Sequence, residues 1–515
     1  MKTINSEGWK HSRHHQRHRL SAKSRQAGAG QRIRKTNRPD GLSTLRPDRG
    51  EDPDRGRENT IERHARVTRE NIKFMKLFFN FIVRCSKFPI MTKRKSIFLL
   101  LLWFFFFHVL SQEVSVYDLL KEIPGAEVKK ITPDSLYKAA WEVMISQPLD
   151  HEHKRKGHFK QRIWVSYLDS LQPVVFVTEG YSAGRNYVSE LARLTHANQI
   201  IVEHRYFGKS VPDKLDWRYL TIQQAAADHH YIYTLFKKVW PGKWISTGIS
   251  KGGQTTMYFK YFYPEDADIC VPYVGPLNFA VVEPRIFTFL DTVGSDSCRA
   301  RIHSYQMRML KERKKIFPLF EKYAEEMGYT WKRVGGDSAA YEYSVLEFPF
   351  AFWQWGLKCR DIPVADTSSK ALFDFFKKAK IFDYFSDFGI GYFEPFFYQA
   401  MTQLGYYGYR PSRYQGEIRH VRDTTFRFAA PRHVRLKYDN RIMPEIDAFL
   451  QDQGDHFIYI YGGTDTWSAT AVRLHGKANA LQIFKPQGSH FTRIGNLPET
   501  QKKAVIDSLE KWLKE

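Results

Sequence analysis

Apolar runs of strand length alternate with helical segments between residues 162 and 284, and this alternation constrains the fold more than any other feature. The runs are rich in β-branched and aromatic residues, as buried strands are. The segment at 221–240 opens with Thr221 and Gln224 in capping-box spacing and continues with helical periodicity. Such alternation predicts a parallel sheet covered by helices on both faces. The expected strands are RIWVSYL, PVVFVTEG, QIIVEHRYFG, KWISTGIS and ADICVPYVGPL.

The alternation stops near Pro284. Residues 285–425 are strongly aromatic and helical in pattern, and strand patterns return only at HFIYIYGGTD and LQIFKPQGSH, before a final amphipathic helix. The sequence therefore predicts an α/β core in two parts, residues 112–284 and 426–515, with a helical insertion at 285–425.

The first 111 residues differ in composition from the rest. They carry 25 of the 79 Lys and Arg residues but only 9 of the 55 Asp and Glu, and thus +16 of the net charge of +24. Residues 1–90 are largely polar and Arg-rich, and the lack of apolar periodicity in residues 1–74 predicts a disordered basic extension. A nucleic-acid-binding arm is the alternative interpretation.

Met91 begins MTKRKSIFLLLLWFFFFHVLSQ, which has a basic start, an apolar run and a small residue, Ser111, at its end. This is the layout of a secretory signal peptide over residues 91–111. Signal peptides act at the amino terminus, so Met91 is expected to be the authentic start and residues 1–90 a mis-assigned extension. We therefore expect a secreted or periplasmic protein that has no stable membrane anchor after the signal peptide is cleaved. The alternative is a basic tail with a membrane anchor.

Three cysteines remain after such cleavage, so one intramolecular disulfide can form. Cys270 lies in an apolar run and is expected to be buried, which leaves Cys298–Cys359 as the predicted pair. Neither metal-type nor redox cysteine spacing occurs. The HEH run at 151–153 could suggest a metal, but we interpret it as an exposed loop, and we expect no metal and no cofactor.

Ser250 stands in Gly248-Ile249-Ser250-Lys251-Gly252, between a predicted strand and a predicted helix. G-x-S-x-G in this context is typical of a nucleophile elbow, where the glycines allow a sharp turn that exposes the hydroxyl. A serine hydroxyl needs a histidine to take its proton and a carboxylate to orient that histidine.

Asp465 and His490 each follow a predicted strand, in the order Ser, Asp, His that α/β-hydrolases show. We therefore predict an α/β-hydrolase core whose catalytic residues are Ser250, Asp465 and His490, with the helical insertion as a cap. Two backbone N–H groups should form the oxyanion hole: that of Lys251, and that of Tyr181 in the early loop TEGYSAG.

Several further motifs occur in the order found in a known family: QPLDHEHKRKGHFKQRIWV, EGYSAGRN, EHRYFGKS, GISKGGQTTMYF, YQAMTQLGYY, YGGTDTWSA and GSHF. Over residues 140–515 the chain resembles the secreted prolyl tri- and tetrapeptidyl aminopeptidases, serine peptidases related to prolyl carboxypeptidase and lysosomal dipeptidyl peptidase. The resemblance implies the same Ser, Asp and His, a cap over the site, and release of short peptides from free N-termini by cleavage after proline. We therefore expect oligopeptides as substrates, and we expect no nucleic-acid partner.

The chain departs from the carboxypeptidase and dipeptidyl peptidase relatives at two positions. Met401 and Gln403 stand where those relatives carry a Cys and a Glu. These departures argue against the relatives' disulfide at this place, and a role of that glutamate in holding a substrate terminus cannot be carried over to this chain. Lys251 after the nucleophile likewise favours the aminopeptidase branch.

An aminopeptidase must recognise an α-ammonium, for which a partly desolvated carboxylate is the natural partner. Glu179, beside the expected oxyanion loop, is our candidate; a structural pairing of Glu179 with a basic group such as Arg205 is the alternative. Proline selectivity needs an aromatic slot. The candidates for it are Trp353, Trp355, Phe396, Tyr407 and Trp467.

Two other functions remain open on the sequence alone. A lipase or esterase would use the same triad, and an inactive hydrolase-fold protein could bind polyanions through its basic N-terminal arm.

Overall fold

The computed structural model describes residues 116–515, so the expected extension (1–90) and signal peptide (91–111) lie outside the described residues. A nine-stranded sheet forms the centre, in the order β1-β2-β3-β5-β4-β6-β7-β8-β9. The strands are β1 (Glu127–Ile131), β2 (Ala139–Pro148), β3 (His158–Tyr167), β4 (Val174–Thr178), β5 (Asn198–Val202), β6 (Trp244–Ile249), β7 (Ile269–Tyr273), β8 (Ile458–Gly462) and β9 (Leu481–Lys485).

The sheet is mixed, so the prediction of a parallel sheet is correct only for β4 to β9. β1, β2 and β3 pair antiparallel with one another, and β3 pairs antiparallel with β5. β1 and β2 were not expected from the sequence. β2 alternates buried and half-buried residues instead of forming a continuous apolar run, as strands of antiparallel edges do.

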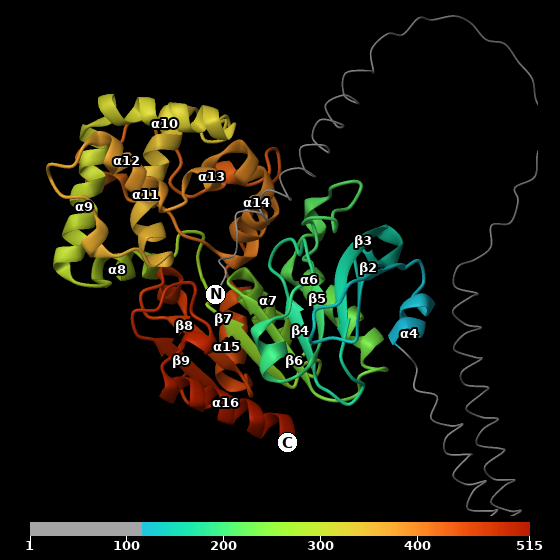
Figure 1. Cartoon of the computed structure of the whole chain (residues 1–515). Helices are drawn as coiled ribbons and strands as arrows, with labels where there is room; N and C mark the ends of the chain where they lie inside the picture. Colours follow the sequence, from blue (N-terminus) through green and yellow to red (C-terminus); the bar gives the residue numbers. More distant parts are fainter. Residues whose placement is uncertain (1–115) are drawn as a thin grey trace, which may run out of the picture. The chain divides into compact units, whose positions relative to one another are not determined.

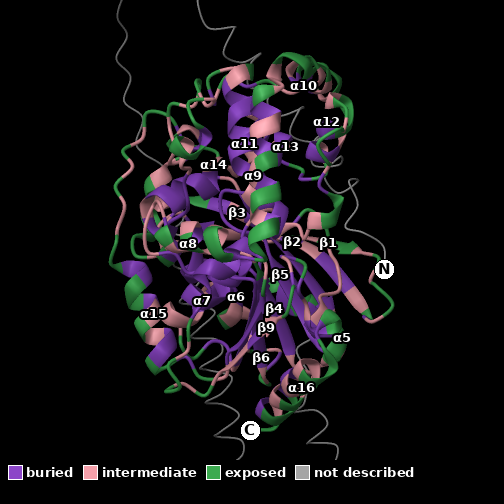
Figure 2. Cartoon of the chain, turned by 90° about the vertical axis from the view of Figure 1, so that its left-hand side faces the viewer, coloured by how far each residue is buried: buried purple, intermediate pink, exposed green. Residues whose placement is uncertain are grey.

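Helices cover both faces of the sheet, as predicted. Val174 and Phe176 of β4 pack in one apolar cluster, and the intervening Val175 and Val177 pack in another on the opposite face, because successive side chains of a strand point to opposite sides. α6 (Ile222–Phe236), α7 (Lys251–Phe262) and α15 (Ile442–Asp452) belong to the first cluster, α5 (Glu190–Leu194) and α16 (Glu499–Lys514) to the second. Figure 2 shows the buried strands between them.

The parallel strands bring four loops to one edge of the sheet. β4, β6, β8 and β9 run in the same direction, so the loops that follow them share the edge at the carboxyl ends, where ligands bind in open α/β sheets. These loops contain Tyr181, Ser250, Asp465 and His490.

Helices inserted between β7 and β8 form the cap and have an aromatic core of their own. In Figure 1 they lie above and to the left of the sheet. They are α8 (Pro284–Thr292), α9 (Asp296–Lys311), α10 (Arg313–Met327), α11 (Asp337–Gln354), α12 (Ser369–Lys377), α13 (Phe382–Phe385) and α14 (Asp387–Gln399). No helix within residues 116–515 has the length and apolarity needed to cross a membrane.

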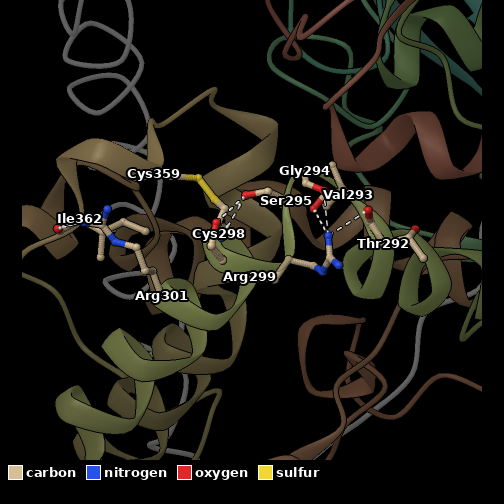
Figure 3. The surroundings of a disulfide bond; sticks show 10 residues. Thr292, Val293, Gly294, Ser295, Cys298, Arg299, Arg301, Cys359 and Ile362 are labelled. Atoms are coloured by element: carbon tan, nitrogen blue, oxygen red, sulfur yellow. Dashed lines mark hydrogen bonds between the residues drawn. A yellow bond between two sulfur atoms is a disulfide. The ribbon is translucent and has the colours of Figure 1, made fainter.

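A disulfide links two segments of the cap, and the predicted pairing is confirmed. Cys298 in the first turn of α9 is bonded to Cys359, 61 residues later, while Cys270 is a buried free thiol. Figure 3 shows the surrounding contacts: Ser295 Oγ accepts the Cys298 N–H at 3.2 Å, and Arg301 donates to the Ile362 carbonyl at 2.8 Å. Side-chain hydrogen bonds thus support the cross-link at both of its ends.

Candidate active site

Ser250 stands at a strained turn between β6 and α7. Its backbone has φ 58° and ψ −121°, a region that residues other than glycine rarely occupy. Its N–H donates to the Tyr273 carbonyl at 2.8 Å. A Cβ at Gly248 would lie 2.3 Å from the Gly252 carbonyl, and one at Gly252 would lie 2.8 Å from the Thr178 carbonyl. Both glycines are therefore required by close backbone approach, as the sequence indicated.

Asp465 and His490 form a buried pair. Nδ1 of His490 lies 2.7 Å from Oδ2 of Asp465, which is fully buried. The Asp465 side chain also accepts the Trp467 N–H at 3.3 Å. This arrangement fixes the imidazole through Nδ1 and leaves Nε2 for another partner. Within residues 116–515 neither the Ser250 hydroxyl nor His490 Nε2 makes a hydrogen bond, and such catalytic contacts commonly tighten only when substrate binds.

The loop after β4 packs directly on the start of α7. A Cβ on Gly180 would lie 2.6 Å from the Gly252 nitrogen and 2.7 Å from Lys251 Cβ. Among the described residues, the N–H groups of Tyr181 and Lys251 donate to no protein acceptor. Two adjacent backbone donors beside Ser250 are what an oxyanion hole requires.

A buried glutamate fixes this loop from the other side. Glu203 accepts the Ala183 N–H at 2.9 Å and the Ser210 N–H at 3.0 Å, and it forms a short ion pair with Arg162. Gly208 has no room for a Cβ, which would lie 2.2 Å from the Glu203 carboxylate. The motifs FKQR and EHRYFGKS therefore build the support of the loop that carries Tyr181.

The alternative in which Glu179 forms a structural ion pair with Arg205 is wrong, because Arg205 pairs with another carboxylate. It forms a two-bond ion pair with Asp228, both contacts at 2.7 Å, and both side chains are fully buried. His151 Nε2 lies 2.7 Å from the same Asp228 carboxylate. The HEH run is thus exposed only in part: His151 is largely buried, whereas His153 is exposed and contacts Asp150 at 3.0 Å.

Glu179 is partly exposed, and among residues 116–515 its carboxylate accepts a hydrogen bond only from the Tyr187 hydroxyl, at 2.7 Å. No cation within residues 116–515 forms an ion pair with it. Desolvation raises the pKa of its carboxyl from 4.5 to about 7, and the charge of Glu203 adds to the effect. A carboxylate in such surroundings favours a cation that arrives from outside.

Glu347 of α11 is a second carboxylate of this kind, and the sequence analysis missed it. It accepts hydrogen bonds from Tyr407 at 2.9 Å and Tyr409 at 2.6 Å. Burial raises its pKa from 4.5 to about 8, and no cation among the described residues pairs with it. The sequence feature that could have indicated it is a single acidic residue within the apolar segment SVLEFPFAFW.

Four of the five predicted pocket residues lie near the loops that carry the expected triad and oxyanion hole. The Trp355 ring packs edge-on against His490 with ring centroids 6.0 Å apart, and Phe396 packs against Tyr181 at 5.8 Å. Trp467, two residues after Asp465, contacts Tyr407 at 5.6 Å. Aromatic rings therefore adjoin the expected acid, base and oxyanion loop.

Trp353 lies apart from these four. Its ring fills the space beside Gly294 and lines a cavity of about 350 Å³ within the cap. None of Ser250, Asp465 and His490 lines that cavity. The cap cavity is therefore distinct from the expected active site.

Helix α11 also contacts the two loops that carry the acid and the base. The His490 N–H donates to the Gln354 carbonyl at 2.9 Å, and the Thr466 hydroxyl donates to the Phe350 carbonyl at 2.9 Å. Gln403, one of the two residues that differ from the related carboxypeptidases and dipeptidyl peptidases, accepts the N–H of Ile222 at the start of α6. Gln403 thus has a structural partner in the core.

Comparison with known proteins places the chain in a family. A family model described as PS-10 peptidase S37 matches residues 110–513. A prolyl tri/tetrapeptidyl aminopeptidase from Streptomyces mobaraensis is 33% identical over 413 residues, 78% of this chain and 86% of that protein. A serine protease from Bipolaris victoriae is 27% identical over 137 residues, 23% of this chain and 26% of that protein. The structure of a proline iminopeptidase from Mycobacterium smegmatis covers 72% of this chain and 98% of its own at 13% identity, with a TM-score of 0.36, too low to add to the argument.

The first two matches span most of the chain, and they confirm the family that the sequence motifs indicated. The chain belongs to the PS-10 peptidase S37 family and is a serine-type peptidase with an α/β-hydrolase core.

Proposed function

We propose that this peptidase is exported and releases tripeptides or tetrapeptides from free N-termini of oligopeptides, cleaving after proline. The observation that carries the proposal is the geometry at one sheet edge: a strained Ser250, the Asp465–His490 pair at 2.7 Å, and the free N–H groups of Lys251 and Tyr181. The similarity to a prolyl tri/tetrapeptidyl aminopeptidase supports the substrate class.

In the proposed mechanism Ser250 Oγ attacks the carbonyl carbon of the scissile peptide bond while His490 Nε2 takes its proton. The oxyanion receives hydrogen bonds from Lys251 and Tyr181. His490 then gives the proton to the leaving amine, and the acyl group stays on Ser250. Water repeats the sequence, with His490 as base, and releases the short peptide.

We assign the α-ammonium of the substrate to Glu179. It is partly exposed, it lies next to Gly180 in the oxyanion loop, and it has no cationic partner within residues 116–515. Glu347 is the alternative, because it also lacks a cation, but it is buried beneath Tyr407 and Tyr409. Exposure favours Glu179.

We assign the proline ring to an apolar slot formed by Trp355, Phe396, Trp467 and Tyr407. Three observations support this assignment: Trp355 packs on His490, Phe396 packs on Tyr181, and Trp467, which packs on Tyr407, donates its backbone N–H to Asp465. We leave Trp353 out of the proposed slot because its ring lines the cap cavity.

Export is supported by the Cys298–Cys359 disulfide, since such bonds persist in oxidising compartments and are rare in the cytosol. Mass spectrometry of the N-terminus of the exported protein tests this point. A mature chain that begins just after Ser111 is the expected result.

The activity is tested by mass spectrometry of a proline-containing peptide ladder with free and acetylated N-termini, with Ser250→Ala as control. Serine-dependent release of tri- or tetrapeptides ending in proline, blocked by acetylation, is expected. Cleavage of acetylated peptides at an equal rate would contradict an ammonium site. Turnover of acyl esters without peptides would indicate an esterase. Inertness towards fluorophosphonates, with retention on polyanions through the N-terminal arm, would indicate an inactive binding protein.

A further inference from the structure

The side chain of Lys251 is buried against the oxyanion loop although its residue type is rarely buried without a counter-ion. Nζ donates to the Gly180 carbonyl at 2.7 Å, and Lys251 is 1% exposed. Among the described residues no carboxylate forms an ion pair with it. The rings of Tyr181 and Phe207 also lie beside it, with centroids 5.6 and 5.5 Å from Nζ.

Burying an amine at such a place is costly. Desolvation lowers the pKa of Lys251 well below its ordinary value, and a methionine or leucine would fill the same space without that cost. A polar group retained under these conditions indicates a specific task for its hydrogen bond.

The acceptor of that hydrogen bond belongs to the peptide group that carries the second oxyanion donor. The Gly180 carbonyl and the Tyr181 N–H are parts of one planar trans peptide, and they point in opposite directions. A donor fixed on the carbonyl side therefore sets the direction of the N–H on the other side.

Other contacts among the described residues also limit how this loop can move, but none of them acts on the Gly180 carbonyl. Gly180 packs on the backbone of Gly252, and Glu203 holds the Ala183 N–H. The Tyr181 carbonyl accepts the His204 N–H at 3.1 Å, which fixes the next peptide group and not the preceding one. Among the described residues Lys251 Nζ is the one group that donates to the Gly180 carbonyl.

We propose that the Lys251 side chain is a positioning residue that holds the Gly180–Tyr181 peptide with its N–H directed at the oxyanion. Lys251 then serves the hole twice: its backbone supplies one donor, and its side chain orients the other. The inference rests on the proposed serine mechanism.

The test compares Lys251→Met with Lys260→Met in the full chain. Methionine keeps the length and apolar stem of lysine but cannot donate. Lys260 lies in the last turn of the same helix, whereas Lys251 begins it. Lys260 Nζ also donates to a backbone carbonyl, that of Ala267 at 2.6 Å. Loss of an entire oxyanion donor costs roughly 10²- to 10³-fold in kcat, so misorientation of one donor should cost about 10- to 100-fold.

The expected result for Lys251→Met is this loss in kcat with KM within about threefold, together with an equal loss in the rate of Ser250 modification by a fluorophosphonate. That reagent needs the serine and the hole but no peptide recognition. Lys260→Met should retain both rates. Equal rates for Lys251→Met and the wild type, a loss confined to KM, or an equal loss in Lys260→Met would overturn the inference.

If Lys251→Met fails to fold, Lys251→Ala assayed with n-propylamine provides the second test. Saturable recovery of fluorophosphonate reactivity by the amine, absent with sodium chloride at equal ionic strength, supports a donor at this position. Folded Lys251→Ala with unimpaired reactivity overturns it. A wild-type chain that does not react with the fluorophosphonate would instead contradict the proposed function itself.

Discussion

The backbone N–H of His490 donates to the carbonyl of Gln354, the last residue of helix α11, at 2.9 Å. The expected catalytic base is thus tied to the cap as well as to Asp465. Movement of this end of α11 should therefore alter the position of the imidazole and hence the rate of the chemical step.

Gly356→Ala tests this coupling. Gly356 has φ 69°, and a Cβ there would lie 2.9 Å from the Cβ of Ser489, next to His490. We expect kcat to fall at least about tenfold, since displacements near 1 Å can cost about 10²-fold. Gly476→Ala is the control, because its φ is 82° but nothing lies within 4 Å of the added Cβ. Both variants should lose some thermal stability, and equal kcat values for the two would contradict the coupling.

Glu179→Gln tests the ammonium site. The ratio of kcat/KM for free against acetylated peptides should fall about 10- to 100-fold, the effect of removing a charge-assisted contact of about 1.5–3 kcal/mol. Glu347→Gln is the matched variant and should leave the ratio unchanged. The opposite pattern would assign the ammonium to Glu347.

The same ratio should depend on pH in the wild type. The pKa of Glu179 is raised to about 7, so below that pH its carboxyl is neutral and cannot pair with an ammonium. The ratio should therefore fall as pH decreases through about 7. A ratio independent of pH between 5 and 9 would exclude Glu179.

Glu347 should make the protein less stable at high pH. Burial raises its pKa from 4.5 to about 8. Between these two values the unfolded chain gives up the proton that the folded chain keeps, so the free energy of unfolding falls by about 1.4 kcal/mol for each step of one in pH. The contribution to stability is complete below pH 4.5 and is lost as pH rises through about 8.

The melting temperature of Glu347→Gln should therefore rise relative to that of the wild type as the pH is raised from about 5 to about 9. Glu342→Gln, on the same helix, should lower it throughout that range, because Glu342 pairs with Arg313 at 2.7 Å and its pKa is lowered. A difference between Glu347→Gln and wild type that does not change with pH would contradict the raised pKa.

Removing the disulfide should destabilise the cap. Cys298→Ser with Cys359→Ser opens a loop of 61 residues, and such cross-links are typically worth about 2–4 kcal/mol. The melting temperature should fall, and a reductant should lower that of the wild type to the same value while leaving the variant unchanged. A wild type insensitive to reductant would show that the bond contributes little.

Much of the parallel half of the fold could be predicted from the sequence, because strands buried on both faces form apolar runs between helices. β2 could not, because Glu142 and Ser146 interrupt its apolar residues, and a pattern of this kind becomes a strand only through its partners in the sheet. The two-part core and its boundaries at residues 284 and 425 stay a prediction.

The candidate triad was predictable because Ser250, Asp465 and His490 each follow a strand in a fixed order along the chain. The partners of buried charged groups were not. Arg205 pairs with Asp228, and Lys251 reaches Gly180, 71 residues away. Such contacts depend on tertiary packing, which leaves no periodic trace in a sequence.

The backbone angles of Ser250 are close to the mirror image of those that L-amino acids prefer in extended turns. A residue of the opposite hand, or glycine, which has no hand, would rest there without strain. Ser250→Gly should therefore yield an inactive protein that is more stable than the active one. Backbone conformation alone would thus favour glycine at position 250, so the strain at Ser250 is a cost in stability that is tied to the presence of its hydroxyl.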